Sequence, residues 1–188
     1  HESLAAAKNA YVIVAALGES AEMSGESSSR TEFQLPENQR DLLKALLKTG
    51  KPVVMVLFTG RPLALTWEEE NVPAILNVWF AGSEAGDAIA DVLFGDVNPS
   101  GKLTATFPQN VGQVPIFYNQ KNTGRPLPEG EWFQKFRSNY LDVSNDPLYP
   151  FGFGLSYTTF SYSNLKISNS KLNSNGKIIA SVEVANTG

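Results

Sequence analysis

The chain has 188 residues, of which 42% are hydrophobic, and a formal net charge of −4 at pH 7. So mild an acidic balance argues against a nucleic-acid partner and against binding to a membrane surface. The sequence has no cysteine, which excludes disulfides and thiolate metal sites, and its only histidine is His1. We therefore predict no metal site, no cofactor and no Ser/His/Asp triad. The longest apolar runs, such as residues 11–17, are too short to span a bilayer.

Apolar runs and helical patterns alternate through the first two thirds of the chain. Residues 11–17, 53–58 and 73–80 are continuous apolar segments, which is typical of strands buried on both faces of a parallel sheet. Between them Pro36 opens a predicted helix with a leucine stripe, and a second helix is predicted over residues 83–94. Residues 103–107 alternate and indicate an outer or antiparallel strand. The order predicts an α/β fold with a mostly parallel sheet and helices on both faces.

The pattern changes near residue 157. Residues 160–167 and 178–184 alternate apolar and polar side chains, and a turn rich in Asn, Ser and Gly separates them. This is the pattern of an antiparallel hairpin, which we interpret as the first strands of an incomplete β-sandwich. We therefore predict a partial α/β-sandwich domain over residues 1–156 and the start of a second domain over 157–188. Both chain ends look cut from a longer protein.

A polar loop follows the first predicted strand and carries three glutamates, Glu19, Glu22 and Glu26, and then Arg30. Ligands of open α/β sheets bind beyond the carboxyl ends of the strands, and Glu19 stands at such an end. A glycosidase needs two carboxyl groups that flank the scissile bond. However, acidic loops are more often simply solvated, so the residues alone leave both interpretations open.

Two other segments could bind a ligand. Residues 81–96 contain a glycine turn that enters a helix, but they lack the G-x-G-x-x-G spacing and the phosphate-loop lysine, which argues against a nucleotide-binding domain. Most of the large aromatic residues are expected in cores or interfaces. Trp132 and Phe133, in the long irregular region, are the better candidates for stacking on a sugar.

Several motifs follow one another in order along nearly the whole chain. They are GESAEMSGESSSR, LPENQRDL, KPVVMVL, GRPLAL, PAILNVWFAG, AIADVLFGDVNPSGKL, TFP, VPIFY, NTGRP and YPFGFGLSYTTF. The last closely resembles the signature of family 3 glycoside hydrolases at the point where a sugar-binding α/β domain meets a fibronectin type III-like domain. NTGRP and the glutamate loop look most like the bacterial periplasmic β-glucosidase branch of that family.

The resemblance implies roles for the loop residues. In two-domain members this loop reaches over the active site of a preceding (β/α)₈ barrel and supplies the acid/base glutamate, while the barrel supplies the aspartate nucleophile. Glu19 matches the glutamate after the strand-ending glycine, so the catalytic prediction falls on Glu19, with Glu22 and Glu26 as alternatives. Glu26 and Arg30 are expected to form a structural pair, and Glu22, Glu26 and Trp132 to bind substrate.

The function implied by the resemblance is part of a retaining, exo-acting β-glucosidase that hydrolyses terminal β-glucosyl residues of short β-glycans. Its partners would be an oligosaccharide or β-glucoside substrate and the N-terminal barrel of the same protein, in the periplasm or secreted. Because no barrel motif occurs here, the chain alone is expected to be inactive. The alternative is a non-catalytic carbohydrate-binding or interaction module, in which the three glutamates have no catalytic role.

Overall fold

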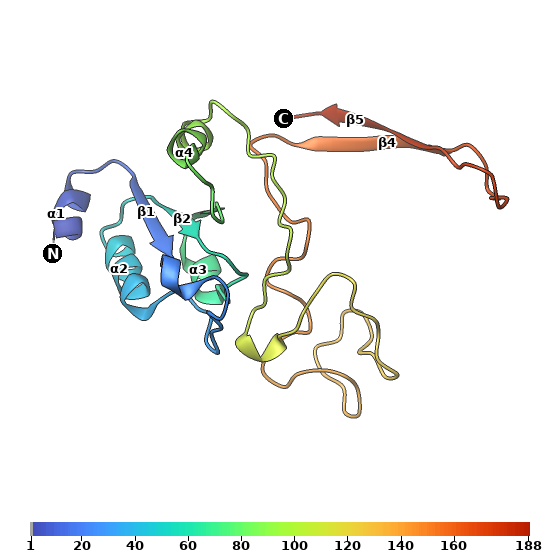
Figure 1. The fold of residues 1–188 in the computed structure, drawn as a ribbon, viewed down its shortest axis with the longest axis horizontal. Helices are drawn as coiled ribbons and strands as arrows, with labels where there is room; N and C mark the ends of the chain where they lie inside the picture. The colour runs from blue at the N-terminus through green and yellow to red at the C-terminus, as the bar shows by residue number, and fades with distance from the viewer. Residues whose placement is uncertain (1) are drawn as a thin grey trace. The chain divides into compact units, whose positions relative to one another are not determined.

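A computed structural model describes residues 2–188 of the chain (Figure 1), so that His1 and the prediction made for it lie outside the described residues. The chain divides into two compact units. The first contains the residues up to 86 and residues 102–153, and the second contains residues 87–101 and 154–188.

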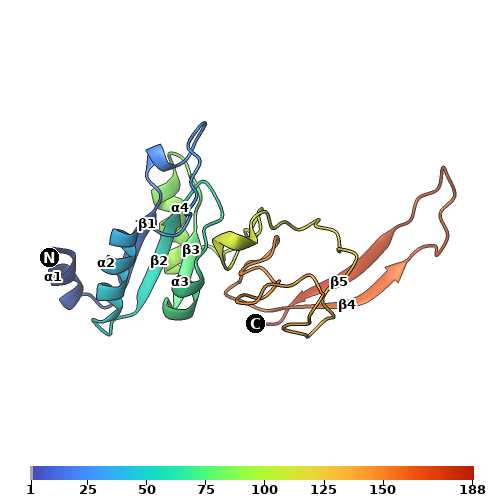
Figure 2. The same cartoon turned by 90° about the horizontal axis from the view of Figure 1, so that it is seen from below.

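The first unit is built on a parallel sheet with the strand order β1-β2-β3 (Figure 2). Its register pairs Ile13 with Val53 and Gly18 with Phe58, and then Val54 with Ala74. Helices follow the strands along the chain, as an α/β fold requires. The elements are α1 (Glu2–Lys8), β1 (Ile13–Gly18), η1 (Ala21–Met23), α2 (Glu37–Leu47), β2 (Val53–Phe58), α3 (Thr66–Asn71), β3 (Ala74–Asn77) and η2 (Val111–Gln113).

The core lies around β2, the central strand, where Met55, Val56 and Leu57 are all buried. The edge strand β1 is different. Its burial alternates, and Val14 remains 52% exposed although its neighbours are buried. The prediction that this segment is buried on both faces is therefore wrong for the described chain, because an edge strand of a three-stranded sheet has fewer neighbours to cover it.

Helix α2 begins after Pro36, as predicted, and buries Leu43 and Leu46 from its leucine stripe. Helix α3 was not predicted, because its sequence TWEEEN has no apolar stripe. It is held by an ion pair instead: Arg40 of α2 donates to both carboxylate oxygens of the fully buried Glu68 in α3, at 2.7 and 3.1 Å. The two helices therefore lie next to each other.

Two predicted strands are shorter or absent. Strand β3 ends at Asn77 rather than at residue 80, and Trp79 has a φ of 50°, which interrupts an extended backbone. Residues 103–107 form no strand. The segment still pairs with the chain around residues 148–153: Phe107 forms an antiparallel bridge with Tyr149, and Leu103 exchanges backbone hydrogen bonds with Gly152 and Phe153, at 2.7 and 2.8 Å.

The second unit contains most of α4 (Ala85–Phe94) and the strands β4 (Phe160–Ile167) and β5 (Ala180–Asn186). The strands pair in antiparallel fashion, with an irregularity between Ser163 and Lys166. Tyr157, which precedes β4, contacts α4 within this unit: its hydroxyl donates to the Val92 carbonyl at 2.8 Å. The fold class is thus confirmed: the chain forms an α/β unit with a parallel sheet and, later in the sequence, a small antiparallel sheet.

A tight contact between β1 and β2 generates the first prediction. Gly18 has a φ of +147°, and a Cβ added to it would lie 1.8 Å from the Phe58 carbonyl oxygen. We expect Gly18→Ala to lower the free energy of unfolding by at least about 3 kcal/mol, through backbone strain and steric clash. Urea unfolding of the 188-residue chain, followed by tryptophan fluorescence, measures this. Gly124→Ala is the control, because its added Cβ meets nothing within 4 Å; equal losses in the two variants would contradict the prediction.

Candidate functional site

The first two strands end side by side and fix the backbone that carries Glu19. The Glu19 N–H donates to the Phe58 carbonyl at 2.9 Å, which extends the parallel ladder by one residue. The side-chain amide of Gln39 in α2 binds Gly18 from the other side. Its oxygen accepts from the Gly18 N–H at 2.7 Å and its nitrogen donates to the Gly18 carbonyl at 2.8 Å. Both neighbouring elements therefore determine where the Glu19 side chain points.

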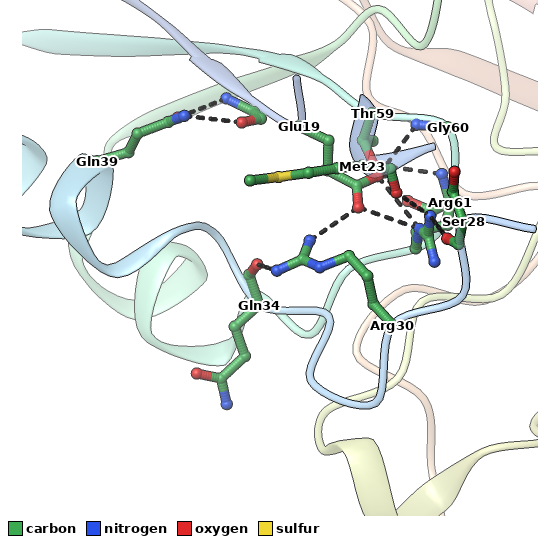
Figure 3. A network of polar contacts seen from close by, with 10 residues as sticks. Glu19, Met23, Ser28, Arg30, Gln34, Gln39, Thr59, Gly60 and Arg61 are labelled. Atoms are coloured by element: carbon green, nitrogen blue, oxygen red, sulfur yellow. Dashed lines mark hydrogen bonds and ion pairs between the residues drawn. The ribbon is translucent and has the colours of Figure 1, made fainter. Parts of the chain in front are cut away.

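The Glu19 carboxylate is fully buried and contacts four donor groups (Figure 3). Arg30 donates to Oε1 at 2.8 Å, and Arg61 Nε lies 3.1 Å from the same oxygen. The Thr59 hydroxyl donates to Oε2 at 2.9 Å and the Gly60 N–H at 3.4 Å. Two arginines and two neutral donors thus compensate one buried charge, as a buried carboxylate requires.

The electrostatic balance keeps Glu19 ionised. Burial is the largest influence on the pKa of this carboxyl group and would raise it. The hydrogen bonds from Arg30 and Thr59, the positive charge of Arg61 and the Gly60 N–H act in the opposite direction, and together they lower the pKa below the ordinary value for glutamate. A carboxyl group with a lowered pKa carries no proton to donate near neutral pH.

Arg61 also holds the loop that follows Glu19. Its Nη2 donates to the carbonyl oxygens of Met23 and Ser28, the latter at 2.9 Å. Gly60 allows the loop to pack closely against the residues that follow β2, because a Cβ at this position would lie 2.0 Å from the Ser24 hydroxyl oxygen. The loop is therefore clamped to the end of β2 at both sides of residues 24–27.

The other two loop glutamates are exposed. Glu22 lies in η1, and Glu26 lies between Gly25 and Ser27, which have φ values of 136° and 59°. The expected structural pair between Glu26 and Arg30 is wrong, since Arg30 pairs with Glu19 instead. Burial explains the difference: the enclosed carboxylate of Glu19 needs a countercharge, whereas that of Glu26 is solvated.

Trp132 lies elsewhere on the first unit. Its side chain is 58% exposed, and it lines a hollow of about 410 Å³ together with Trp67, Asn110 and Asp142. Within residues 2–188, no hydrogen bond or ion pair joins Trp132 to the loop glutamates. The structure therefore groups Glu19, Glu22 and Glu26 on one loop and leaves Trp132 outside that group.

The sequence prediction missed Thr59, Gly60 and Arg61. A signal was present, because these residues follow β2 directly, as Glu19 follows β1. Parallel neighbouring strands bring their carboxyl ends to one edge of a sheet. Gln39 gave no comparable signal, since a glutamine in the first turn of a helix is ordinarily solvated.

No cluster of three or more His, Cys, Asp or Glu side chains among residues 2–188 could hold a metal ion. No helix of this part of the chain is both long enough and apolar enough to cross a membrane.

Residues 1–157 match the Glycosyl hydrolase family 3 C-terminal domain. The chain belongs to this family. The resemblance found in the sequence motifs is therefore confirmed, and the loop described above is part of a family 3 C-terminal domain.

Curated relatives of this family 3 chain carry glycosidase names. A protein named periplasmic beta-glucosidase from Salmonella typhimurium is 56% identical over 188 residues, which is 100% of this chain and 24% of that protein. A beta-xylosidase from Formosa agariphila is 46% identical over 187 residues, 25% of its own length. The chain thus spans about a quarter of the curated relatives it matches.

Solved structures support the same family 3 assignment. A beta-glucosidase from Listeria innocua is 44% identical with a TM-score of 0.89, over 97% of this chain and 25% of that one. A beta-glucosidase from Erythrobacter marinus, EmGH1, is 42% identical with a TM-score of 0.86, over 100% of this chain and 24% of that one.

The Glu19 ion pairs generate a prediction about stability and pH. Glu19→Gln removes a buried charge and leaves two arginines without it, so the free energy of unfolding of the 188-residue chain should fall by about 3 kcal/mol at pH 7. Because the pKa of Glu19 is lowered in the folded state, this contribution is complete above the unfolded pKa, about 4.3, and disappears as the pH falls through the folded pKa.

Urea unfolding of the wild-type and Glu19→Gln chains between pH 7 and pH 3 measures this difference. The two curves should converge as the pH is lowered. The exposed Glu22→Gln serves as the control and should change stability by no more than about 0.5 kcal/mol. A wild-type advantage that grows toward pH 3 would show that the folded pKa of Glu19 is raised instead.

Proposed function

We propose that this chain is the C-terminal portion of a retaining, exo-acting β-glucosidase, to which it contributes the acid/base loop, residues 19–30. The substrates would be terminal β-glucosyl residues of short β-glycans. The observation that carries the proposal is a carboxylate-bearing loop clamped at the carboxyl edge of the sheet, where α/β folds bind ligands. The family and the names of the relatives support it.

The chemistry divides between this loop and a second domain. A retaining glycosidase uses two carboxyl groups about 5–5.5 Å apart, one as nucleophile and one as acid and then base. We propose that a loop carboxyl protonates the leaving oxygen and later deprotonates the attacking water. The nucleophile would be an aspartate of an N-terminal (β/α)₈ barrel in the same protein.

The domain boundary, location and substrate contacts belong to the same proposal. We propose that residues 1–156 belong to the α/β-sandwich domain and 157–188 to a fibronectin type III-like domain. The name of the Salmonella relative supports a periplasmic location. For the substrate we propose contacts with Glu22 and Trp132, both of which are exposed.

The geometry favours Glu26 as the acid/base over Glu19, the residue expected from the sequence. A general acid must come within hydrogen-bond reach of the leaving oxygen and have a carboxyl oxygen free to contact it. Glu19 has a lowered pKa, and both of its oxygens already accept hydrogen bonds. Its role would be to anchor the loop. Glu26 is exposed, and its backbone lies between the Met23 and Ser28 carbonyls that Arg61 holds. Glu22 precedes this clamped segment.

Kinetics of the longer protein test the acid/base assignment. Glu26→Ala should lower kcat/KM on cellobiose by about 10²–10⁴-fold, because the leaving oxygen is no longer protonated. The loss should be much smaller on a dinitrophenyl β-glucoside, whose leaving group needs no proton, and added azide should partly restore turnover. Glu22→Ala is the comparison at an exposed loop glutamate proposed to contact the substrate: any loss there should be similar on the two substrates, and azide should not restore it.

The three glutamates give different results under the competing assignments. The dependence on leaving group and the rescue by azide should appear in Glu26→Ala alone. Their appearance in Glu19→Ala or Glu22→Ala instead would move the acid/base to that residue. Their absence from all three variants would show that this loop supplies no acid/base, as expected of a non-catalytic binding module.

The division of the chemistry predicts that the isolated 188-residue chain is inactive. It would offer an acid/base candidate without the barrel nucleophile, and retaining catalysis needs both. Release of nitrophenol from a nitrophenyl β-glucoside by the purified chain should equal that of its Glu26→Ala variant. Wild-type turnover clearly above this background would overturn the two-domain account.

A further inference from the structure

We propose that Arg61 is a positioning residue for the acid/base loop, a role that rests on the proposed function. Its guanidinium joins three parts of the fold. Nε lies 3.1 Å from Oε1 of Glu19, which follows β1. Nη2 donates to the carbonyl of Met23 and, at 2.9 Å, to that of Ser28 (Figure 3). One side chain therefore connects the buried anchor with both ends of the segment that carries Glu26.

The clamped segment is short and turns sharply. Between the two held carbonyls, Gly25 and Ser27 have positive φ values, and the Ser28 N–H donates to the Gly25 carbonyl at 3.2 Å. Fixing both ends of such a turn leaves few backbone positions open to Glu26. Its side chain stays exposed and able to reach a substrate while its backbone is held. This combination is what a preorganised catalytic group needs.

An arginine is required for this task. Its planar fork presents five N–H donors in fixed directions, whereas a lysine ammonium is a compact point charge on a flexible stem. Arg61 uses that fork to neutralise Glu19 and to bind two backbone carbonyls at once. A lysine here would keep the charge that Glu19 needs but lose the geometry of the clamp.

Arg30 does not share this role, although it too pairs with Glu19. Its second contact is to the Gln34 carbonyl at 3.4 Å, beyond the end of the loop. Arg30 therefore fixes where the loop returns to α2. Among the arginines of residues 2–188, Arg61 is the one that hydrogen-bonds within the segment around Glu26.

The chain offers a matched control. Arg40 pairs with the fully buried carboxylate of Glu68, and its side chain is 18% exposed, close to the 23% of Arg61. Its hydrogen bonds reach Glu68 and the Gln34 side chain and none of residues 20–29. Arg40→Met thus breaks a comparable buried ion pair without releasing the loop.

The experiment compares Arg61→Lys, Arg61→Met and Arg40→Met in the longer protein. For both Arg61 variants we expect kcat/KM on cellobiose to fall by about 10²-fold, the cost of a misplacement of about 1 Å, with a much smaller loss of kcat/KM on a dinitrophenyl β-glucoside. Amide hydrogen exchange should accelerate in residues 20–29 and stay unchanged in β1 and β2 of Arg61→Lys. Arg40→Met should show neither the leaving-group dependence nor the faster exchange in the loop.

Each outcome decides the proposal. Equal losses on the two substrates, or loop exchange in Arg61→Lys as slow as in the wild type, would overturn it, because a merely structural arginine gives that result. If Arg61→Met fails to fold, Arg61→Lys alone decides. Glu26→Ala distinguishes a failure of the acid/base assignment from a failure of the positioning role. If the loss of activity depends on the leaving group in Glu26→Ala but not in Arg61→Lys, only the positioning role of Arg61 is rejected. Absence of that dependence in Glu26→Ala rejects the acid/base assignment, while the exchange data still test the clamp.

Discussion

A buried carboxylate needs compensation, and at Glu19 this requirement shapes everything around it. Its side chain has no exposed surface, so the negative charge must be balanced by protein groups. Arg30 and Arg61 approach from different parts of the chain, and Arg61 brings the Met23 and Ser28 carbonyls with it. The two arginines consequently do more than balance the charge of Glu19: they determine the path of a loop that would otherwise be a flexible polar segment.

The sheet makes this compensation possible. Residues 18–19 and 58–61 are far apart in sequence, but the parallel register brings Gly18 opposite Phe58. The chain segments that follow β1 and β2 approach each other closely at Gly18 and Gly60. A Cβ at either residue would clash with a neighbour, so both positions require glycine. The sequence requirement for glycine and the electrostatic requirement for arginine thus meet at one edge of the sheet, where ligands of α/β folds bind.

Much of the fold could be predicted from periodicity, since long apolar runs bounded by Gly and Pro determine β2 and the start of α2 locally. Helix α3 could not be predicted, because it is held by the ion pair between Glu68 and Arg40, which is distant in sequence. The length of β3 could not be predicted either, because the strand ends shortly before Trp79, whose φ is positive. The sequence predicted the position of the candidate site but not the roles of its residues. The loop and its three glutamates were evident from their place after a strand, but the sequence carries no sign that Glu19 is enclosed while Glu26 is exposed. Glu19 is enclosed by groups distant in sequence, such as Thr59 and Arg61, which lie 40 and 42 residues away.

The account rests on Glu19 as an ionised anchor, and the pKa of its carboxyl group tests this most directly. It can be measured by a carbon-13 titration of glutamate carboxyl resonances, with the Glu19 signal assigned from its loss in Glu19→Gln. We expect a pKa below the ordinary glutamate value of about 4.3, so that the group stays charged throughout the working range. A pKa raised toward about 6 or 7 would contradict the account and return the acid/base role to Glu19.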